Sequence, residues 1–211
     1  MSIIIRPFSE KDLLEVAELH FHSYHFQAAE YRRHELQYFP LEKFQKNWQD
    51  FCENKNGRIA LVATDGNKIV GLARYSPRIE KPNTDKWLIT HSELLDKALS
   101  SPQLAQYNQV YIMPEYIQHK LGARLSLIGF EDMVNVGAEY ALTERNAMNT
   151  PSAMFQKKSY LAEDVATCPD LDIKKGEYGA PRDIWSTSIM SVVTVRNAVE
   201  NLRKRIENTR D

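Results

Sequence analysis

The pattern of hydrophobic and polar positions predicts a strand and two helices at the start of the chain. Residues 3–6 form a β-branched run that ends at Pro7, which predicts a strand. Ser9 has the character of a helix N-cap, with Asp12 three residues later, and the apolar positions after Leu13 follow helical spacing. A second helix is predicted by an apolar stripe that ends before Gly57: Leu41, Phe44, Trp48, Phe51 and Cys52.

An antiparallel hairpin is predicted at residues 58–75. Residues 58–64 and 68–75 are largely apolar and β-branched, and Asp65-Gly66-Asn67 stands between them. Gly66 tolerates the positive φ that tight hairpin turns require. The next segment, 76–109, is broken by Pro77 and Pro82 and contains one candidate helix, at 88–99.

The second half of the chain alternates short strands and helices. The pattern predicts strands at 110–113, 140–143 and 183–190, a helix at 121–136, and a short helix at 151–158. The chain ends in an amphipathic helix whose apolar face carries Val192, Val195, Val199, Leu202 and Ile206. This face fits packing on the same domain or on a second subunit, so a homodimer stays open as an assembly.

The composition is that of a globular protein with little net charge. The chain has 211 residues, 43% of them hydrophobic, and 27 Lys+Arg stand against 28 Asp+Glu. A near-neutral chain lacks the basic face that nucleic acids require, so we expect no nucleic-acid partner. No apolar run reaches the roughly 20 residues of a membrane-spanning helix, and the N-terminus lacks signal-peptide features. We therefore expect a cytoplasmic protein with no membrane partner.

Neither the cysteines nor the histidines predict a metal site. Cys52 and Cys168 lack CxxC spacing and fit two reduced thiols. Four histidines lie close together in the sequence: His20, His22, His25 and His34. Because no carboxylate or cysteine completes a ligand set at helical spacing, we expect no metal ion. We expect these histidines to face solvent or to line a groove.

The passage from the strand at 110–113 into the helix at 121–136 indicates an anion site. Where a loop enters a helix, several backbone N–H groups lack partners and the helix dipole favours negative charge. Gly122 and Ala123 are small enough for a ligand to approach the backbone, and basic residues stand beside them: His119, Lys120 and Arg124. This pattern indicates a phosphate or pyrophosphate site, and hence a nucleotide-like cofactor.

The same junction resembles the core of a known family. VYIMPEYIQHKLGARL, followed by an asparagine-containing segment and the short helix TPSAMFQKKSY, is similar to the GNAT superfamily of acyl-CoA-dependent N-acyltransferases. The resemblance extends over residues 3–160 and includes RIALVATDGNKIVGLARY. It implies an α/β (α+β) fold, with a mixed, twisted sheet of about six or seven strands flanked by helices. Residues 1–165 would form this domain, and residues 166–211 would add a strand and an amphipathic helix packed on it.

The resemblance also implies an activity, the transfer of an acetyl or other acyl group from acyl-CoA to an amine of a small molecule or a protein. A backbone N–H at Ile112 or Met113 would polarise the thioester carbonyl, and Asn146 or Asn149 would bind the pantetheine arm. The pyrophosphate would be held by the loop amides of Gln118, His119, Lys120, Leu121, Gly122 and Ala123. Proton transfer would fall to water or to the hydroxyl of Tyr111 or Tyr160.

Several residues depart from the family pattern. Ile117 occupies the position of the family's Arg or Gln, and Phe155 or Gln156 occupies that of its acid tyrosine. Lys120 replaces the first loop glycine. A positive φ at Lys120 would cost about 1–2 kcal/mol, whereas an ordinary conformation could place its ammonium on a phosphate. No carboxylate occurs between residues 106 and 113.

These features leave two alternative functions open. The departures fit a catalytically degenerate, GNAT-like binding or regulatory protein. The connection 79–108 is longer than is usual in the family, which fits a synthase of long-chain N-acyl amino acids or acyl-homoserine lactones. For an active enzyme, the resemblance implies that residues of the first two helices shape the acceptor pocket: His22, Tyr24, His25, Tyr31, Arg32 and Arg33.

Overall fold

A computed structural model describes residues 2–30, 40–146, 150–168 and 188–208, with the backbone alone at 24–30, 146 and 150. The strands are β1 (Ile3–Pro7), β2 (Ile59–Asp65), β3 (Lys68–Ile79), β4 (Leu88–Ile89), β5 (Leu104–Ile112), β6 (Tyr140–Asn146), β7 (Glu163–Cys168) and β8 (Ser188–Thr194). The α-helices are α1 (Leu13–Glu30), α2 (Leu41–Glu53), α3 (Ser92–Ser100), α4 (Leu121–Asn135), α5 (Thr150–Phe155) and α7 (Val195–Glu207). Shorter turns are η1 (Glu10–Asp12), η3 (Pro114–His119) and the π-helical η4 (Gln156–Tyr160).

The strands form one mixed sheet in the order β1-β2-β3-β5-β6-β8-β7-β4. Neighbours are antiparallel except for β5 and β6, which run parallel. The expected α/β fold is thus confirmed, with eight strands in the described residues rather than six or seven. The additional strands are β4 and β7, and β7 spans the boundary expected after residue 165.

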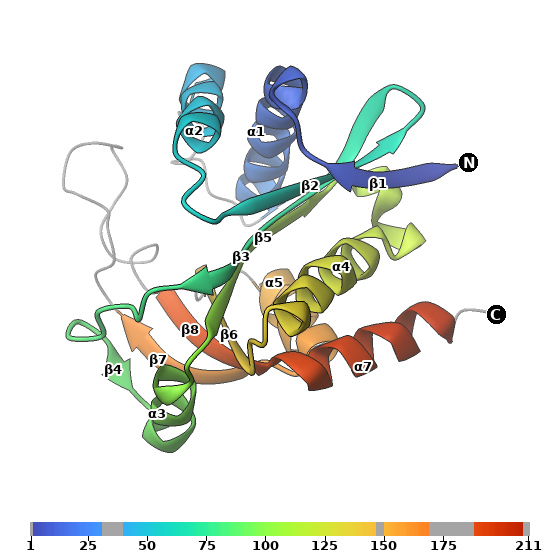
Figure 1. The fold of residues 1–211 in the computed structure, drawn as a ribbon. Helices are drawn as coiled ribbons and strands as arrows, with labels where there is room; N and C mark the ends of the chain where they lie inside the picture. Colours follow the sequence, from blue (N-terminus) through green and yellow to red (C-terminus); the bar gives the residue numbers. More distant parts are fainter. Residues whose placement is uncertain (1, 31–39, 147–149, 169–187, 209–211) are drawn as a thin grey trace.

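Helices cover both faces of the sheet (Figure 1). On one face, α1 and α2 pack over β2 and β3 around a core that includes Val16, Trp48 and Leu72. On the other face, α4 and α7 lie side by side and enclose a larger core that includes Phe130 and Leu202. The sheet therefore lies between two layers of helices.

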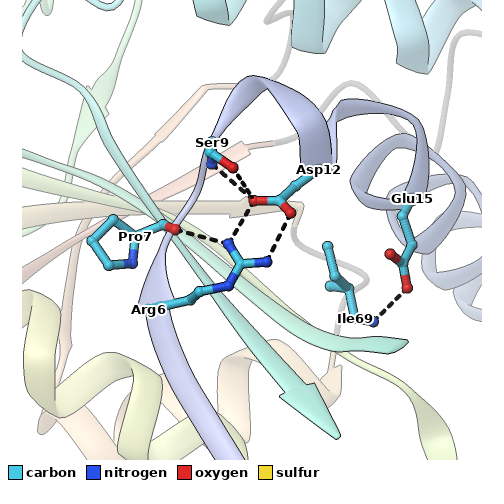
Figure 2. A network of polar contacts seen from close by, with 6 residues as sticks. All are labelled: Arg6, Pro7, Ser9, Asp12, Glu15 and Ile69. Atoms are coloured by element: carbon cyan, nitrogen blue, oxygen red, sulfur yellow. Dashed lines mark hydrogen bonds and ion pairs between the residues drawn. The ribbon is translucent and has the colours of Figure 1, made fainter. Parts of the chain in front are cut away.

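An ion pair fixes the start of α1 to the first strand (Figure 2). The guanidinium of Arg6 binds both carboxylate oxygens of Asp12, at 2.6 and 2.8 Å. The backbone N–H and the hydroxyl of Ser9 donate to the same carboxylate, which confirms the expected pairing of Ser9 with Asp12. One turn further along, Glu15 accepts the Ile69 N–H of β3. These contacts set the position of α1 on the sheet.

Two glycines allow α4 to lie very close to the sheet. A Cβ on Gly129 would stand 3.0 Å from Tyr107 Cε2, and one on Gly71 would stand 3.0 Å from Leu121 Cδ2. Real Cβ atoms rarely come so near, so a side chain at either position would push the helix outward. Gly129, a poor helix former on propensity alone, is therefore explained by packing.

The C-terminal boundary differs from the prediction. The strand expected at 183–190 is observed as β8, and residues 183–187 lie outside the described residues. Val192 lies in β8 rather than in the helix, and α7 begins at Val195. The physical reason is that β8 is covered on both faces: Val192 packs towards α3 and Val193 towards α4. Its apolar residues therefore form a continuous run, which is not distinguishable from a helix start by spacing alone.

Candidate functional site

The sheet opens in its middle, between β5 and β6. These strands pair only where Leu104–Tyr107 meet Tyr140–Thr143, although β5 continues to Ile112 and β6 to Asn146. On its other side, β5 stays paired with β3, but the register shifts between Tyr107 and Gln109 and leaves Asn108 as an extra residue. Such a bulge bends a strand and increases its twist. The two strands therefore separate beyond Tyr107 and Thr143, next to the bulge at Asn108.

A cleft with a volume of about 1230 Å³ occupies this opening. The separated ends of β5 and β6 form two of its walls, and the start of α4 and the α5–η4 segment form others. Residues of α1 line one end, and Arg205 and Asn208 at the end of α7 line another. Of the long connection 79–108, Tyr107 and Asn108, which belong to β5, line the cleft, whereas residues 79–106 do not. Instead, α3 packs at the far edge of the sheet with β7 and β8.

The start of α4 presents free backbone amides beside this cleft. The Arg124 N–H makes a helical hydrogen bond to the Lys120 carbonyl at 3.0 Å. The amides of Leu121, Gly122 and Ala123 therefore have no carbonyl partner within the helix. A Cβ on Gly122 would stand 3.4 Å from Phe155 Cζ and 3.7 Å from Ile112 Cγ1. Because Gly122, Ile112 and Phe155 all line the cleft, a ligand there can reach the helix backbone. These residues fit a diphosphate group.

Lys120 adopts the left-handed conformation, with φ 51° and ψ 22°. Of the two conformations considered for this residue, the structure thus has the one that a glycine would favour. The ammonium donates to the Arg205 carbonyl at the end of α7. Lys120 and Arg205 both line the cleft, so two cationic side chains stand near the free amides.

The amides of β5 differ in where they point. Met113 N–H donates to the Val70 carbonyl at 3.0 Å and is therefore used inside the sheet. Successive N–H groups of a strand point to opposite sides, so the Ile112 N–H points away from β3. That side is the open one, because β6 no longer pairs with β5 there. Ile112 is thus the better placed of the two residues for contacting a ligand carbonyl.

Tyr160 is part of a buried hydroxyl network. Ser126 donates to the Gly122 carbonyl at 2.7 Å, and its oxygen accepts from Tyr107 at 3.1 Å and from Tyr160 at 2.7 Å. Burial raises the pKa of Tyr160 well above its ordinary value. Although Tyr160 borders the cleft, its hydroxyl proton is directed at Ser126. The network connects β5 and η4 to the first turn of α4.

Tyr111 lies on the opposite face of the sheet, towards α1. Its ring stands 4.5 Å from the His20 ring, and it lines the cleft. Burial raises the pKa of Tyr111 to about 12. At neutral pH the hydroxyl is protonated, so it can donate a hydrogen bond but cannot act as a base.

The other residues singled out from the sequence are more dispersed. Leu121 is buried in the core, and Gln118 and His119 are exposed on η3 and do not line the cleft. Asn146 ends β6 with its side chain undescribed, and Asn149 lies outside the described residues. On the acceptor side, His22 is exposed and lines the cleft. The remaining candidates there fall where the structure does not describe side chains: Tyr24, His25, Tyr31, Arg32 and Arg33.

The described residues contain no cluster of three or more His, Cys, Asp or Glu that could hold a metal ion. Of the four histidines named from the sequence, His20 is buried in the core rather than exposed. Among the described residues, every helix is too short or too polar to cross a membrane.

Several polar cleft residues were not identified from the sequence, among them Asn108, Gln109 and Arg145. The sequence contains one weak indication of these residues, namely that each is a polar residue in or next to an otherwise buried strand. Arg145 follows the buried run of β6, and Asn108 and Gln109 interrupt the apolar residues of β5. Their importance depends on the opening of the sheet, which strand patterns do not reveal.

No protein-family model matches the sequence, and no curated protein matches it significantly. Solved structures, in contrast, match over most of the chain. A protein from Desulfovibrio desulfuricans assigned to the GNAT acetyltransferases is 15% identical, with a TM-score of 0.60 over 92% of this chain and 99% of that one. PaiA N-acetyltransferase from Thermoplasma acidophilum, solved with coenzyme A, is 16% identical, with a TM-score of 0.59 over 92% and 99%. YncA from Salmonella typhimurium, solved with acetyl-CoA, is 14% identical, with a TM-score of 0.58 over 92% and 95%. At these identities the likeness establishes the fold.

Proposed function

We propose that this chain, which has the GNAT fold, is an N-acyltransferase that transfers an acetyl or other acyl group from acyl-CoA to an amine. The observation that carries the proposal is the separation of β5 from β6 directly beside the free amides of α4. An elongated ligand with an anionic diphosphate and an amide-bearing arm matches this combination. The structures of PaiA with coenzyme A and of YncA with acetyl-CoA support the choice of ligand.

The diphosphate would bind at the first turn of α4. The amides of Leu121, Gly122 and Ala123 are free to donate, and the helix dipole favours an anion at this end. Lys120 and Arg205 add positive charge at the cleft. The ammonium of Lys120 already has a protein acceptor, so the backbone rather than this side chain would supply the main contacts.

When bound, the thioester supplies an activated acyl carbonyl. The nitrogen of the neutral amine attacks the carbonyl carbon, so that the C–N bond forms as the C–S bond breaks. The amine loses one proton and the departing thiolate gains one. The Ile112 N–H would donate to the carbonyl oxygen, where negative charge develops. The cleft contributes further by holding the two reactants together.

Tyr111 is the side chain best suited to assist the departing thiolate. Its hydroxyl is protonated at neutral pH, and its ring lines the cleft on the face of the sheet that carries α1. A hydrogen bond from this hydroxyl to sulfur would stabilise the developing charge. In this proposal Tyr160 is a positioning residue, because its hydroxyl acts through Ser126 on the carbonyl of Gly122.

A second candidate function is binding of acyl-CoA without turnover. Two observations favour it: Lys120 stands in the left-handed position of a loop glycine, and Tyr160 is committed to Ser126. A panel of amines assayed by thiol release separates the two functions. Release of free CoA that requires an amine supports the enzyme, whereas binding with no release supports the second candidate. Including octanoyl-CoA beside acetyl-CoA tests the long-chain alternative in the same assay.

The direct test of the binding site is calorimetric titration with acetyl-CoA and CoA. Gly122→Leu is expected to weaken binding at least tenfold, because a leucine side chain would extend between Ile112 and Phe155 into the cleft. Gly122→Ala is the matched control, since its Cβ makes an ordinary contact at 3.4 Å. It should bind within about threefold of the wild-type protein. An absence of heat at millimolar ligand, or equal affinity in both variants, would refute the site.

A further inference from the structure

Arg145 is a buried cation with unused hydrogen-bonding capacity in the wall of the cleft. It lies near the end of β6, and its side chain is only 4% exposed. Its Nη2 donates to Asp164 at 3.0 Å. Its Nε and Nη1 have no acceptor within the part of the chain that the structure describes. Burying an unpaired donor of a charged group is costly. Binding of an anion that accepts from these nitrogens is therefore favoured.

The partner of Arg145 cannot neutralise it fully. Asp164 also binds the Lys157 ammonium at 2.9 Å and accepts from the Ser191 hydroxyl at 2.7 Å. One carboxylate therefore faces two cations, so the group formed by Arg145, Lys157 and Asp164 carries a net positive charge. Glu144, which precedes Arg145 on β6, is exposed and also lines the cleft. It projects from the opposite face of the strand because successive side chains alternate.

The facing wall offers the complementary chemistry. Asn108 and Gln109 lie on β5 where the strand leaves β6, and both line the cleft. Asn108 Oδ1 and Gln109 Oε1 are buried and accept no hydrogen bond from the described residues. Unsatisfied amide oxygens of this kind accept N–H donors. The β6 wall of the opening therefore offers donors for an anion, and the β5 wall offers acceptors for N–H groups.

We propose that the acceptor is an amine that also carries a carboxylate, of the amino-acid class. Arg145 binds the carboxylate, and the amide oxygens of Asn108 and Gln109 accept the N–H groups of the amine. This inference rests on the proposed acyltransferase function and specifies its substrate class. The acyl group passes from the CoA sulfur to the amine nitrogen, one N–H proton is lost, and the thiolate takes up a proton. The carboxylate stays unchanged and serves only for recognition.

The test compares amino acids with their carboxamides. The pairs are L-leucine with L-leucinamide and L-phenylalanine with L-phenylalaninamide. Within each pair, a carboxylate is replaced by a carboxamide of nearly the same shape, and only the carboxylate is negatively charged. We expect kcat/KM to favour the acids by roughly 10- to 150-fold, the range of one charge-assisted hydrogen bond. The amine of a carboxamide is the weaker base and is more often neutral at pH 7. A preference for the acids therefore runs against the intrinsic reactivity.

Variants assign this preference to Arg145. Arg145→Gln should abolish the discrimination between acid and carboxamide, and Arg145→Lys should retain part of it. Arg78→Gln, at an exposed arginine of β3 outside the cleft, is the matched control and should keep the full ratio. The affinity for CoA, measured by calorimetry, should stay within about twofold in all three variants. The wild-type ratio needs no variant, so it tests the proposal even if an Arg145 variant fails to fold.

The outcomes separate this inference from the proposed function. Efficient acylation of neutral amines with no preference for carboxylates would refute the inference and leave the acyltransferase function standing. If Arg145→Gln instead weakens CoA binding tenfold and leaves the acid-to-carboxamide ratio unchanged, the guanidinium serves the donor ligand and the inference is wrong. Where no turnover occurs, calorimetric binding of the same acids and carboxamides to the CoA-loaded protein decides the question by the same ratio.

Discussion

At the scale of single residues, His20 shows how burial controls a titratable group. Its ring lies 4.8 Å from that of Phe44 and 4.5 Å from that of Tyr111, and Trp48 Nε1 donates to its Nδ1 at 3.4 Å. Burial, together with the nearby charge of Arg74, lowers the pKa of His20 to about 3. The side chain is therefore neutral in the folded protein throughout the physiological range.

This shift in the pKa of His20 predicts a loss of stability in mild acid. An unfolded histidine titrates near pH 6.5, so between that pH and about 3 the unfolded state binds one proton more than the folded state. The free energy of unfolding should therefore fall by up to about 1.4 kcal/mol per pH unit below 6.5. Denaturant titrations at pH 7 and pH 5 should show a weaker pH dependence in His20→Phe. His22→Gln, at an exposed histidine of α1, should keep the wild-type slope, and equal slopes in all three proteins would contradict the prediction.

The two tyrosines at the cleft should respond differently to loss of the hydroxyl. Tyr160→Phe removes one hydrogen bond to Ser126 and should cost about 1 kcal/mol of stability, with kcat at saturating acyl-CoA within about threefold of wild type. Tyr111→Phe removes the proposed donor to sulfur and should lower kcat about 100-fold. Steady-state kinetics and thermal melts of both variants provide the comparison. A large loss of kcat in Tyr160→Phe alone would reverse the two assignments.

At the scale of elements, the Arg6–Asp12 pair joins β1 to α1 (Figure 2). The hydrogen bond from the guanidinium outweighs burial and, with those from Ser9, holds the pKa of Asp12 well below its usual range. The stabilisation is thus complete above the unfolded pKa of about 3.9 and is lost as the pH falls towards the folded value. The two-point geometry and the burial of Asp12 distinguish this pair from exposed ion pairs such as Lys97–Glu93.

Replacement of Asp12 should therefore matter more than replacement of Glu93. We expect Asp12→Asn to lower the free energy of unfolding by about 2 kcal/mol at pH 7 and by a smaller amount at pH 3, where part of the stabilisation is already lost. Glu93→Gln should change it by less than about 0.5 kcal/mol at either pH, because its ion pair is exposed. Chemical denaturation at both pH values measures the difference. A pH-independent effect of Asp12→Asn would show that shape rather than charge is responsible.

Sequence patterns identify elements whose signals are local. The stripe on α2 and the turn at Gly66 were sufficient to place that helix and the β2–β3 hairpin, because each depends on neighbours in the chain. The hydrophobic pattern did not predict β7, a short strand whose partner β8 lies about 25 residues further along the chain. It also assigned Val192 to a helix, since a strand buried on both faces lacks alternation. Tertiary burial therefore explains both errors.

At the scale of the whole molecule, the candidate site was only partly predictable. The loop-to-helix junction at Gly122 is a local feature, and the sequence identified it together with the cleft residues Ile112 and Lys120. Arg145 depends on Asp164 and on the parting of two strands, so its place in the cleft follows from the complete fold. No pattern within β6 distinguishes an arginine of this kind from a solvated charge at a strand end.

The opening between β5 and β6 also has a mechanical consequence. It divides the sheet into two half-sheets, β1-β2-β3-β5 and β6-β8-β7-β4, whose strands are joined by the four residue pairs between Leu104–Tyr107 and Tyr140–Thr143. Outside this ladder, the packing of α7 against α4 and the ion pair from Arg203 to Glu131 at 2.6 Å hold the halves together. A molecule bound across the opening would touch both halves and restrict their relative rotation. Binding in the cleft would therefore reduce the internal motion of the whole protein.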